Sequence, residues 1–301
     1  MAFTAKDVMD LRTKSGAGML ECKKALTDAD GDMEKAAELL RERGIAKAVK
    51  KEGRIAAEGV VGAYVCTKCG TGVLLEINCE SDFVSRGDKF HGIVDEVAKV
   101  VAENKPADVE ALNACKLGDG TVKDYITNQT AVIGEKISIR RFEIYQTSGK
   151  IETYIHMGGK VGVMVDAADF KEGAEETLHD IALQIAASKP LYVTEAEVPA
   201  EVLEKEKEIM LVQMQNDPKN ANKPKNILEK IVAGKMGKFY QDNCLLDQPF
   251  VKDDSLKVKD VIGSKFKVVK FARFEMGEGL EKKSENLQDE VAKQVAAMKK
   301  S

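Results

Sequence analysis

The chain has 301 residues, of which 32% are charged and 44% hydrophobic, and its formal net charge is −4 at pH 7. These values fit a soluble globular protein with room for about two or three domains. They disfavour a general affinity for nucleic acid or anionic membranes. No apolar run reaches the roughly 18 residues that span a bilayer, and the first residues lack the layout of a secretion signal. The six cysteines are therefore expected to be reduced thiols in the cytoplasm.

Three short helices are expected in the N-terminal domain, residues 1–55. Thr4 can cap the first helix, with Asp7 in the position of a capping-box partner. The third runs over Met33–Arg43, and Gly44 is expected to stop it. A basic linker follows, in which a solvated face is favoured over phosphate contacts because the whole chain is acidic; its cations are Lys47, Lys50, Lys51 and Arg54.

An internal repeat organises the middle of the chain. AYVCTKCGTGVLLEI, residues 63–77, aligns without gaps on TYIHMGGKVGVMVDA, residues 153–167, and each copy predicts a β-hairpin. An amphipathic helix follows each hairpin, over Asp88–Asn104 and Glu175–Ser188, and each helix should end at a Lys-Pro pair. A third, alternating strand closes each copy, because KISIRRFEI resembles KVVKFARFEM. The pattern predicts an α+β protein with two β-β-α-β subdomains, 56–145 and 146–280, each with a three-stranded antiparallel sheet.

The first copy is six residues longer than the second between its hairpin and its helix. The hairpins are offset by 90 residues and the Lys-Pro pairs by 84. The extra length contains CESDFVSRG, which places Asp82 beside Phe83 on a short connection. By themselves these residues favour a core Phe83 with Asp82 as a cap. The twin copy lacks the extra segment, so the fold does not need it, and a partner-facing role stays open.

Two further helical segments are expected at the C-terminal end of the chain. Residues 195–245 predict a helical hairpin inserted in the second subdomain, either a protruding interaction or dimerisation arm or a layer packed on the main body. Residues 281–301 predict a C-terminal helical module with Leu287, Val291, Val295 and Met298 on one stripe.

The common catalytic motifs are absent from the sequence. It has no phosphate-binding glycine loop, dinucleotide fingerprint or zinc-protease motif. His91 and His179 are expected on polar helix faces, whereas His156 lies at a hairpin tip, where a contact and a bland role are equally consistent. Cys66 and Cys69 form one CxxC pair, which is half of a zinc site or a redox pair, but a variable turn is favoured. A binding protein without a cofactor, rather than an enzyme, is expected.

Several long motifs in order resemble the elongation factor Ts family, the guanine-nucleotide exchange factors of elongation factor Tu. They are LRTKSGAGMLECKKAL, INCESDFV, QPFVKD and RFEMGEG, and the resemblance covers nearly the whole chain. It implies a ubiquitin-associated-like N-terminal bundle, two core subdomains, a dimerisation hairpin and a C-terminal module. It also implies elongation factor Tu as partner and a possible homodimer. The expectation of no membrane or direct nucleic-acid contact rests on the composition.

The resemblance also implies the contact residues. Asp82 and Phe83, with their neighbours Ser81 and Val84, would act near the magnesium site of the GTPase, and His156 would press from the second hairpin. The N-terminal domain would contribute a contact surface of Arg12, Met19, Leu20 and Lys23. Ser81 stands where the family usually has Thr, and Leu20 where it often has Met; both changes are conservative.

The expected mechanism is a wedge that loosens GDP and its magnesium ion without chemistry on the nucleotide. Two alternatives remain from the residues. One is a redox or zinc-dependent enzyme that uses Cys66 and Cys69. The other is an RNA-binding accessory protein that uses residues 47–54, which the acidic composition disfavours.

Overall fold

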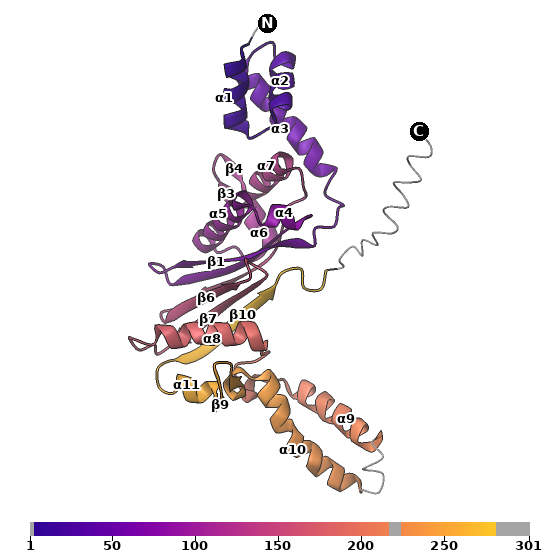
Figure 1. The fold of residues 1–301 in the computed structure, drawn as a ribbon, viewed down its shortest axis with the longest axis vertical. Coiled ribbons are helices and arrows are strands. Elements are labelled where there is room, and N and C mark those ends of the chain that lie inside the picture. Colours follow the sequence, from indigo (N-terminus) through magenta and orange to yellow (C-terminus); the bar gives the residue numbers. More distant parts are fainter. Residues whose placement is uncertain (1–2, 217–223, 281–301) are drawn as a thin grey trace. The chain divides into compact units, whose positions relative to one another are not determined.

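The computed structural model describes residues 3–216 and 224–280, and its fold is α+β. The described residues divide into two compact units, residues 3–61, 75–142 and 275–280 in the first and residues 62–74, 143–216 and 224–274 in the second. Figure 1 traces the elements in chain order. The expected division at 1–55, 56–145, 146–280 and 281–301 stays a prediction, and its last module lies outside the described residues.

The N-terminal bundle consists of three helices around a small apolar core. Thr4 caps the first helix in a capping box with Asp7, as the sequence predicts. Gly16 ends this helix at φ 67°, a conformation that suits glycine. The helices are α1 (Ala5–Ser15), α2 (Met19–Asp28) and α3 (Met33–Val49). Their buried core contains Val8, Leu11, Cys22, Ala25, Leu26, Ala29 and Ala36.

The prediction that Gly44 stops the third helix is wrong. α3 continues through Gly44 to Val49. A β-carbon placed on Gly44 would lie 3.0 Å from the Ala131 side chain, so the missing side chain permits a close approach between α3 and α7 (Val122–Ile133), the helix that carries Ala131. Glycine here serves packing, a role that local sequence does not distinguish from a helix end.

The first copy of the repeat has the predicted order of hairpin, helix and closing strand. Its sheet has the order β1-β2-β5, and β2 is buried along its whole length. A short helix, α4, lies in the extra segment before the predicted helix α5. The bounds are β1 (Glu58–Cys66), β2 (Thr71–Cys79), α4 (Asp82–Ser85), α5 (Asp88–Asn104), α6 (Val109–Ala114), β3 (Lys116–Leu117), β4 (Gly120–Thr121), α7 (Val122–Ile133) and β5 (Ser138–Gln146).

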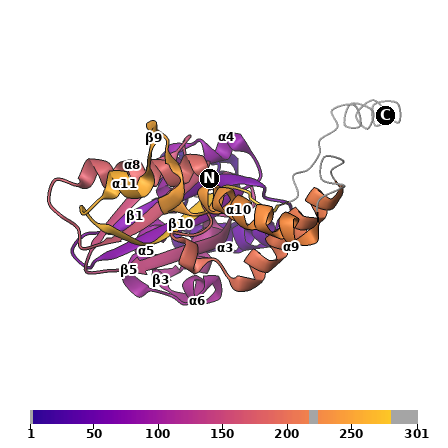
Figure 2. The same ribbon diagram turned by 90° about the horizontal axis from the view of Figure 1, so that it is seen from below.

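The second copy repeats this arrangement. Its sheet has the order β10-β7-β6, with β6 and β7 antiparallel from Lys150↔Ala167 to His156↔Val161. Figure 2 shows α8 and α11 side by side. The bounds are β6 (Lys150–His156), β7 (Val161–Ala168), α8 (Glu175–Ser188), β8 (Pro249–Phe250), β9 (Asp253–Lys257), α11 (Val258–Ile262) and β10 (Lys267–Glu275). The core contains Val163, Val165, Leu178, Ile181, Ile185, Leu245 and Phe266.

The repeat extends to the way the two long helices end. Lys105 follows α5 and Lys189 follows α8, with φ of 50° and 49°, and a proline comes next in each case. Both helices span the residues predicted from their apolar periodicity, and both end at the predicted Lys-Pro pairs.

The predicted helical hairpin is present as α9 (Ala200–Asn216) and α10 (Lys225–Asn243), which lie side by side in Figure 1. Its buried contacts come from Met214, Leu228 and Val232. Several large apolar side chains of the hairpin are exposed, namely Val202, Ile209, Val212 and Ile227. None of the described helices combines the length and the apolar character that crossing a membrane requires.

Candidate partner-binding site

The extra segment of the first copy presents an aromatic side chain to solvent. Phe83 lies on α4 and is 87% exposed. A large apolar side chain gains nothing from water contact, and burial of such a side chain is worth about 1.5–3 kcal/mol. The sequence alternative of a buried Asp82-Phe83 pair therefore does not hold for Phe83, and its exposure marks a candidate contact point.

The neighbours of Phe83 shape the short helix that carries it. Ser81 is the N-cap, and its hydroxyl accepts a hydrogen bond from the Val84 N–H at 3.4 Å. Asp82 forms an ion pair with Arg86 at 2.8 Å, one helical turn away. Val84 is half-buried. The structure therefore gathers the four predicted residues Ser81–Val84 on one short element.

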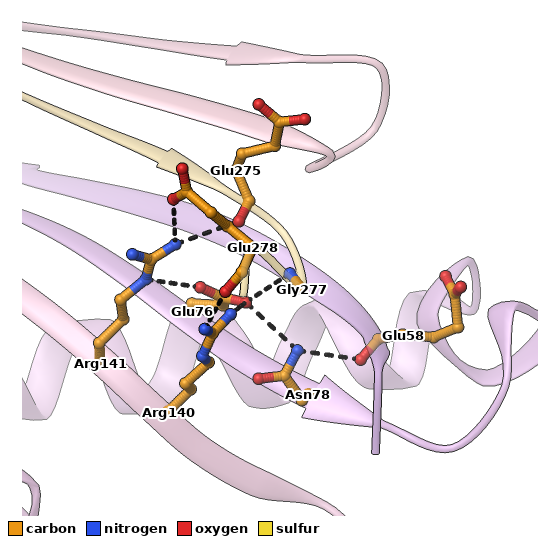
Figure 3. Close-up of polar contacts among 8 residues, drawn as sticks. All are labelled: Glu58, Glu76, Asn78, Arg140, Arg141, Glu275, Gly277 and Glu278. Atoms are coloured by element: carbon orange, nitrogen blue, oxygen red, sulfur yellow. Dashed lines mark hydrogen bonds and ion pairs between the residues drawn. The ribbon is translucent and has the colours of Figure 1, made fainter. Parts of the chain in front are cut away.

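β2, which leads into this segment, is fixed by a buried carboxylate. The Glu76 side chain is fully buried and receives the guanidinium groups of Arg140 at 2.9 Å and Arg141 at 2.7 Å (Figure 3). The Gly277 N–H donates to it at 2.8 Å, and the Asn78 amide donates at 3.3 Å. A buried charge is tolerated only when it is paired and hydrogen-bonded, as this one is.

The same arginines hold the segment that follows β10. Arg141 donates to the Glu275 carbonyl at 3.1 Å and pairs with the Glu278 carboxylate at 3.3 Å, while Arg140 donates to the Glu278 carbonyl (Figure 3). Glu76 and the two arginines therefore join β2, β5 and residues 275–278 of the first unit.

Acid is expected to weaken this unit. Burial by itself would raise the pKa of Glu76, but the Gly277 N–H and the two guanidinium groups outweigh it and hold the pKa below its ordinary value. Because folding lowers this pKa, the contribution is complete above the unfolded pKa of about 4.3 and is lost as the pH falls towards the folded value. Urea unfolding at pH 7 and at pH 4 should show a loss of stability in acid that is smaller in a Glu76→Gln variant. An equal loss in both proteins would contradict this assignment.

His156 lies at the end of β6, beside the tip of the second hairpin. Its Nδ1 is 2.9 Å from the Tyr154 hydroxyl. Tyr154 also packs edge-on against His179, whose Nδ1 is 2.8 Å from Glu152. His156 is exposed, and its neighbour Met157 is 73% exposed. His156 lies beside the tip of the hairpin, as the sequence predicts, and His179 is exposed on α8, as expected for a polar helix face.

The predicted N-terminal contact residues are all exposed. Arg12 lies in the last turn of α1, and Met19, Leu20 and Lys23 lie in the first turns of α2. Leu20 is 82% exposed, the largest exposure among the large apolar side chains of this bundle that the structure describes. These exposed residues are candidates for a second contact, on the first unit.

The CxxC pair lies at a turn, as the sequence predicts, but the expectation that all six cysteines are reduced thiols is wrong for Cys66 and Cys69. Cys66 and Cys69 form a disulfide at the turn between β1 and β2, whereas the other four cysteines take no part in a disulfide. Zinc binds cysteine as the thiolate, which a disulfide does not offer. Among the described residues, no group of three or more histidine, cysteine or acidic side chains is placed to hold a metal ion.

The sequence reasoning missed two supports of the site, the buried Glu76 and Glu135, whose carboxylate accepts a hydrogen bond from the Ser81 hydroxyl. The sequence held a signal for Glu76, because this glutamate stands inside the apolar run GVLLEI, which is expected to be buried. A glutamate is almost never buried unless it is paired. Two consecutive arginines in KISIRRFEI were the available partners. Glu135 follows Gly134, the C-cap of α7, and carried no comparable signal.

Comparison with known proteins places the chain among the translation elongation factors. The family described as Elongation factor TS matches residues 80–278. The elongation factor Ts of Clostridium perfringens strain SM101 is 47% identical, over 97% of this chain and 98% of the relative. That of Nitratiruptor sp. is 44% identical, over 98% of this chain and 100% of the relative. That of Alkalilimnicola ehrlichii is 45% identical, over 98% of this chain and 99% of the relative. The chain belongs to the elongation factor Ts family, as its motifs predict.

Proposed function

We propose that this protein binds elongation factor Tu with GDP and promotes release of the nucleotide, so that GTP can bind in its place. The observation that carries the proposal is Phe83, an aromatic side chain that is 87% exposed on a short, capped helix. Family membership supports the choice of partner. The protein would act in the cytoplasm as an exchange factor, with no catalytic chemistry or cofactor of its own.

In the proposed mechanism, Phe83 acts as a wedge. It has only two side-chain torsions and a large apolar area, so its insertion between side chains of the GTPase costs little entropy. Insertion would displace the segment that positions Mg²⁺, and the magnesium ion bridges protein and phosphate oxygens, so GDP would be held less tightly. Asp82 would accept hydrogen bonds from displaced backbone and fix the direction of entry.

Two further surfaces would support the wedge. At the second hairpin, the Tyr154 hydroxyl occupies Nδ1 of His156, so Nε2 is the nitrogen that a partner would meet, with exposed Met157 beside it. The N-terminal bundle would anchor the complex through Arg12, Met19, Leu20 and Lys23, all of which are exposed. Apolar anchors with a charged rim are typical of such interfaces.

The helical hairpin α9–α10 would serve as a contact or dimerisation arm. Its buried contacts are few, and it exposes Val202, Ile209, Val212 and Ile227. A second copy of the chain is the proposed occupant of this surface.

The test is release of a fluorescent GDP analogue from elongation factor Tu, followed by stopped flow. Release should become faster as the protein is added and reach a plateau when the complex saturates. Because binding and release are linked, added GDP or GTP should in turn weaken the complex. A release rate that does not respond to the protein would contradict the proposal.

A further inference from the structure

Two glutamates tie the start of the Phe83 segment to the residues after α7. The Glu135 carboxylate accepts hydrogen bonds from the Ser81 hydroxyl at 2.6 Å and from the Ser81 N–H at 2.9 Å. It also accepts the Glu80 N–H at 3.2 Å. In return, Glu80 accepts the Lys136 N–H at 2.6 Å and pairs with Arg54 at 3.2 Å. All of these residues belong to the first unit.

This reciprocal arrangement acts on the N-cap of α4. The Ser81 hydroxyl donates to Glu135 and accepts from the Val84 N–H, so one side chain joins the carboxylate to the helix. α4 has only four residues, and a single turn is not stable on its own because helix nucleation is unfavourable. Phe83 contributes almost no packing to it, since its side chain is 87% exposed. The direction of Phe83 therefore depends on how firmly the cap is held.

We infer that Glu135 is a positioning residue for nucleotide exchange, which acts through Ser81 to hold Phe83 ready for its partner. The inference rests on the proposed function. A loop that is ordered before binding does not have to lose side-chain and backbone freedom when the complex forms. Glu135 needs no contact with the GTPase in this role. The chemistry it supplies is a fixed set of acceptors for two backbone N–H groups and one hydroxyl.

The experiment measures GDP release from elongation factor Tu with the single variants Glu135→Ala, Glu135→Gln and Phe83→Ala. A double variant combines Glu135→Ala with Phe83→Ala. Glu135→Ala should lower the release rate constant at saturating factor by about fivefold, the equivalent of about 1 kcal/mol of ordering. Glu135→Gln keeps one acceptor and should fall between Glu135→Ala and the parent. In the Phe83→Ala background, Glu135→Ala should have no further effect, because both changes remove the same interaction. Glu103→Gln, on the exposed side of α5, is the matched control and should behave as the parent.

Ser81 supplies a conservative rescue. Ser81→Thr keeps the hydroxyl that joins Glu135 to α4 and should release GDP faster than Ser81→Ala, which should match Glu135→Ala. If Ser81 mattered only for stability, the folded Ser81→Thr and Ser81→Ala proteins would release GDP at the same rate at saturating factor. Circular dichroism shows that both are folded before their rates are compared.

The outcomes separate the inference from the function on which it rests. If Phe83→Ala releases GDP as fast as the parent, the wedge itself is wrong and the role of Glu135 falls with it. If Phe83→Ala is slow but folded Glu135→Ala and Glu135→Gln proteins are as fast as the parent, only the positioning role is overturned. The positioning role would also be overturned if the rate losses of Glu135→Ala and Phe83→Ala multiplied in the double variant, because Glu135 would then act elsewhere.

Discussion

Phe83→Ala is expected to slow the catalysed release of GDP from elongation factor Tu by about tenfold to a hundredfold, while the variant stays folded. The estimate corresponds to the loss of about 1.4–2.8 kcal/mol, the range of an aromatic residue at the centre of an interface. Stability should change little, because the side chain is 87% exposed and has little packing to lose. Stopped-flow release at saturating factor gives the rate, and thermal unfolding gives the stability.

A suitable control for Phe83→Ala removes a different exposed apolar side chain. Leu191 lies outside the proposed surfaces and is 65% exposed. Leu191→Ala should release GDP at the parent rate, and Asp82→Ala should be slow in the same sense as Phe83→Ala. If Phe83→Ala and Asp82→Ala were both as fast as the parent, exchange would have to proceed without this segment.

Glu76→Gln is expected to lower the free energy of unfolding by about 3 kcal/mol at pH 7. Removing the charge of a buried partner leaves the guanidinium groups of Arg140 and Arg141 without their counter-charge, and breaking such an arrangement typically costs 3–5 kcal/mol. We expect the lower end of this range of unfolding free energy because both arginines are partly exposed. Urea unfolding of the parent and the variant measures the difference.

Glu278→Gln is the matched control, because Glu278 pairs with Arg141 from an exposed position. Its cost should stay below about 1 kcal/mol, the range of surface ion pairs. If Glu76→Gln unfolded at the same urea concentration as Glu278→Gln, the buried carboxylate would not be a major support of the first unit.

Local pattern predicted the elements that depend on local causes. The Asp88–Asn104 and Glu175–Ser188 helices follow from apolar periodicity and from the prolines that come after them. The repeated order of hairpin, helix and strand follows from two aligned copies. The exposed segment was located by its extra length in the first copy, since a fold that its twin completes without such a segment does not need it.

Pattern could not supply contacts between residues far apart in the chain. Gly44 is a helix interior residue because of Ala131, which lies on another helix. Glu135 contacts Ser81 across 54 positions, and nothing in either neighbourhood specifies the other. Successive strand residues ordinarily face opposite ways, so the convergence of both Arg140 and Arg141 on Glu76 could not be read from alternation.

The bond between the Gly277 N–H and Glu76 joins residues 201 positions apart, and this separation has a consequence for biosynthesis. At the usual rate of about 5–20 residues per second, roughly 10–40 s pass between the synthesis of the two residues. During this interval the nascent first unit contains a carboxylate whose final donor does not yet exist. Closure of so long a loop carries an entropic cost before its contacts form. The last step of folding for this unit therefore waits until residues 275–278 have been synthesised.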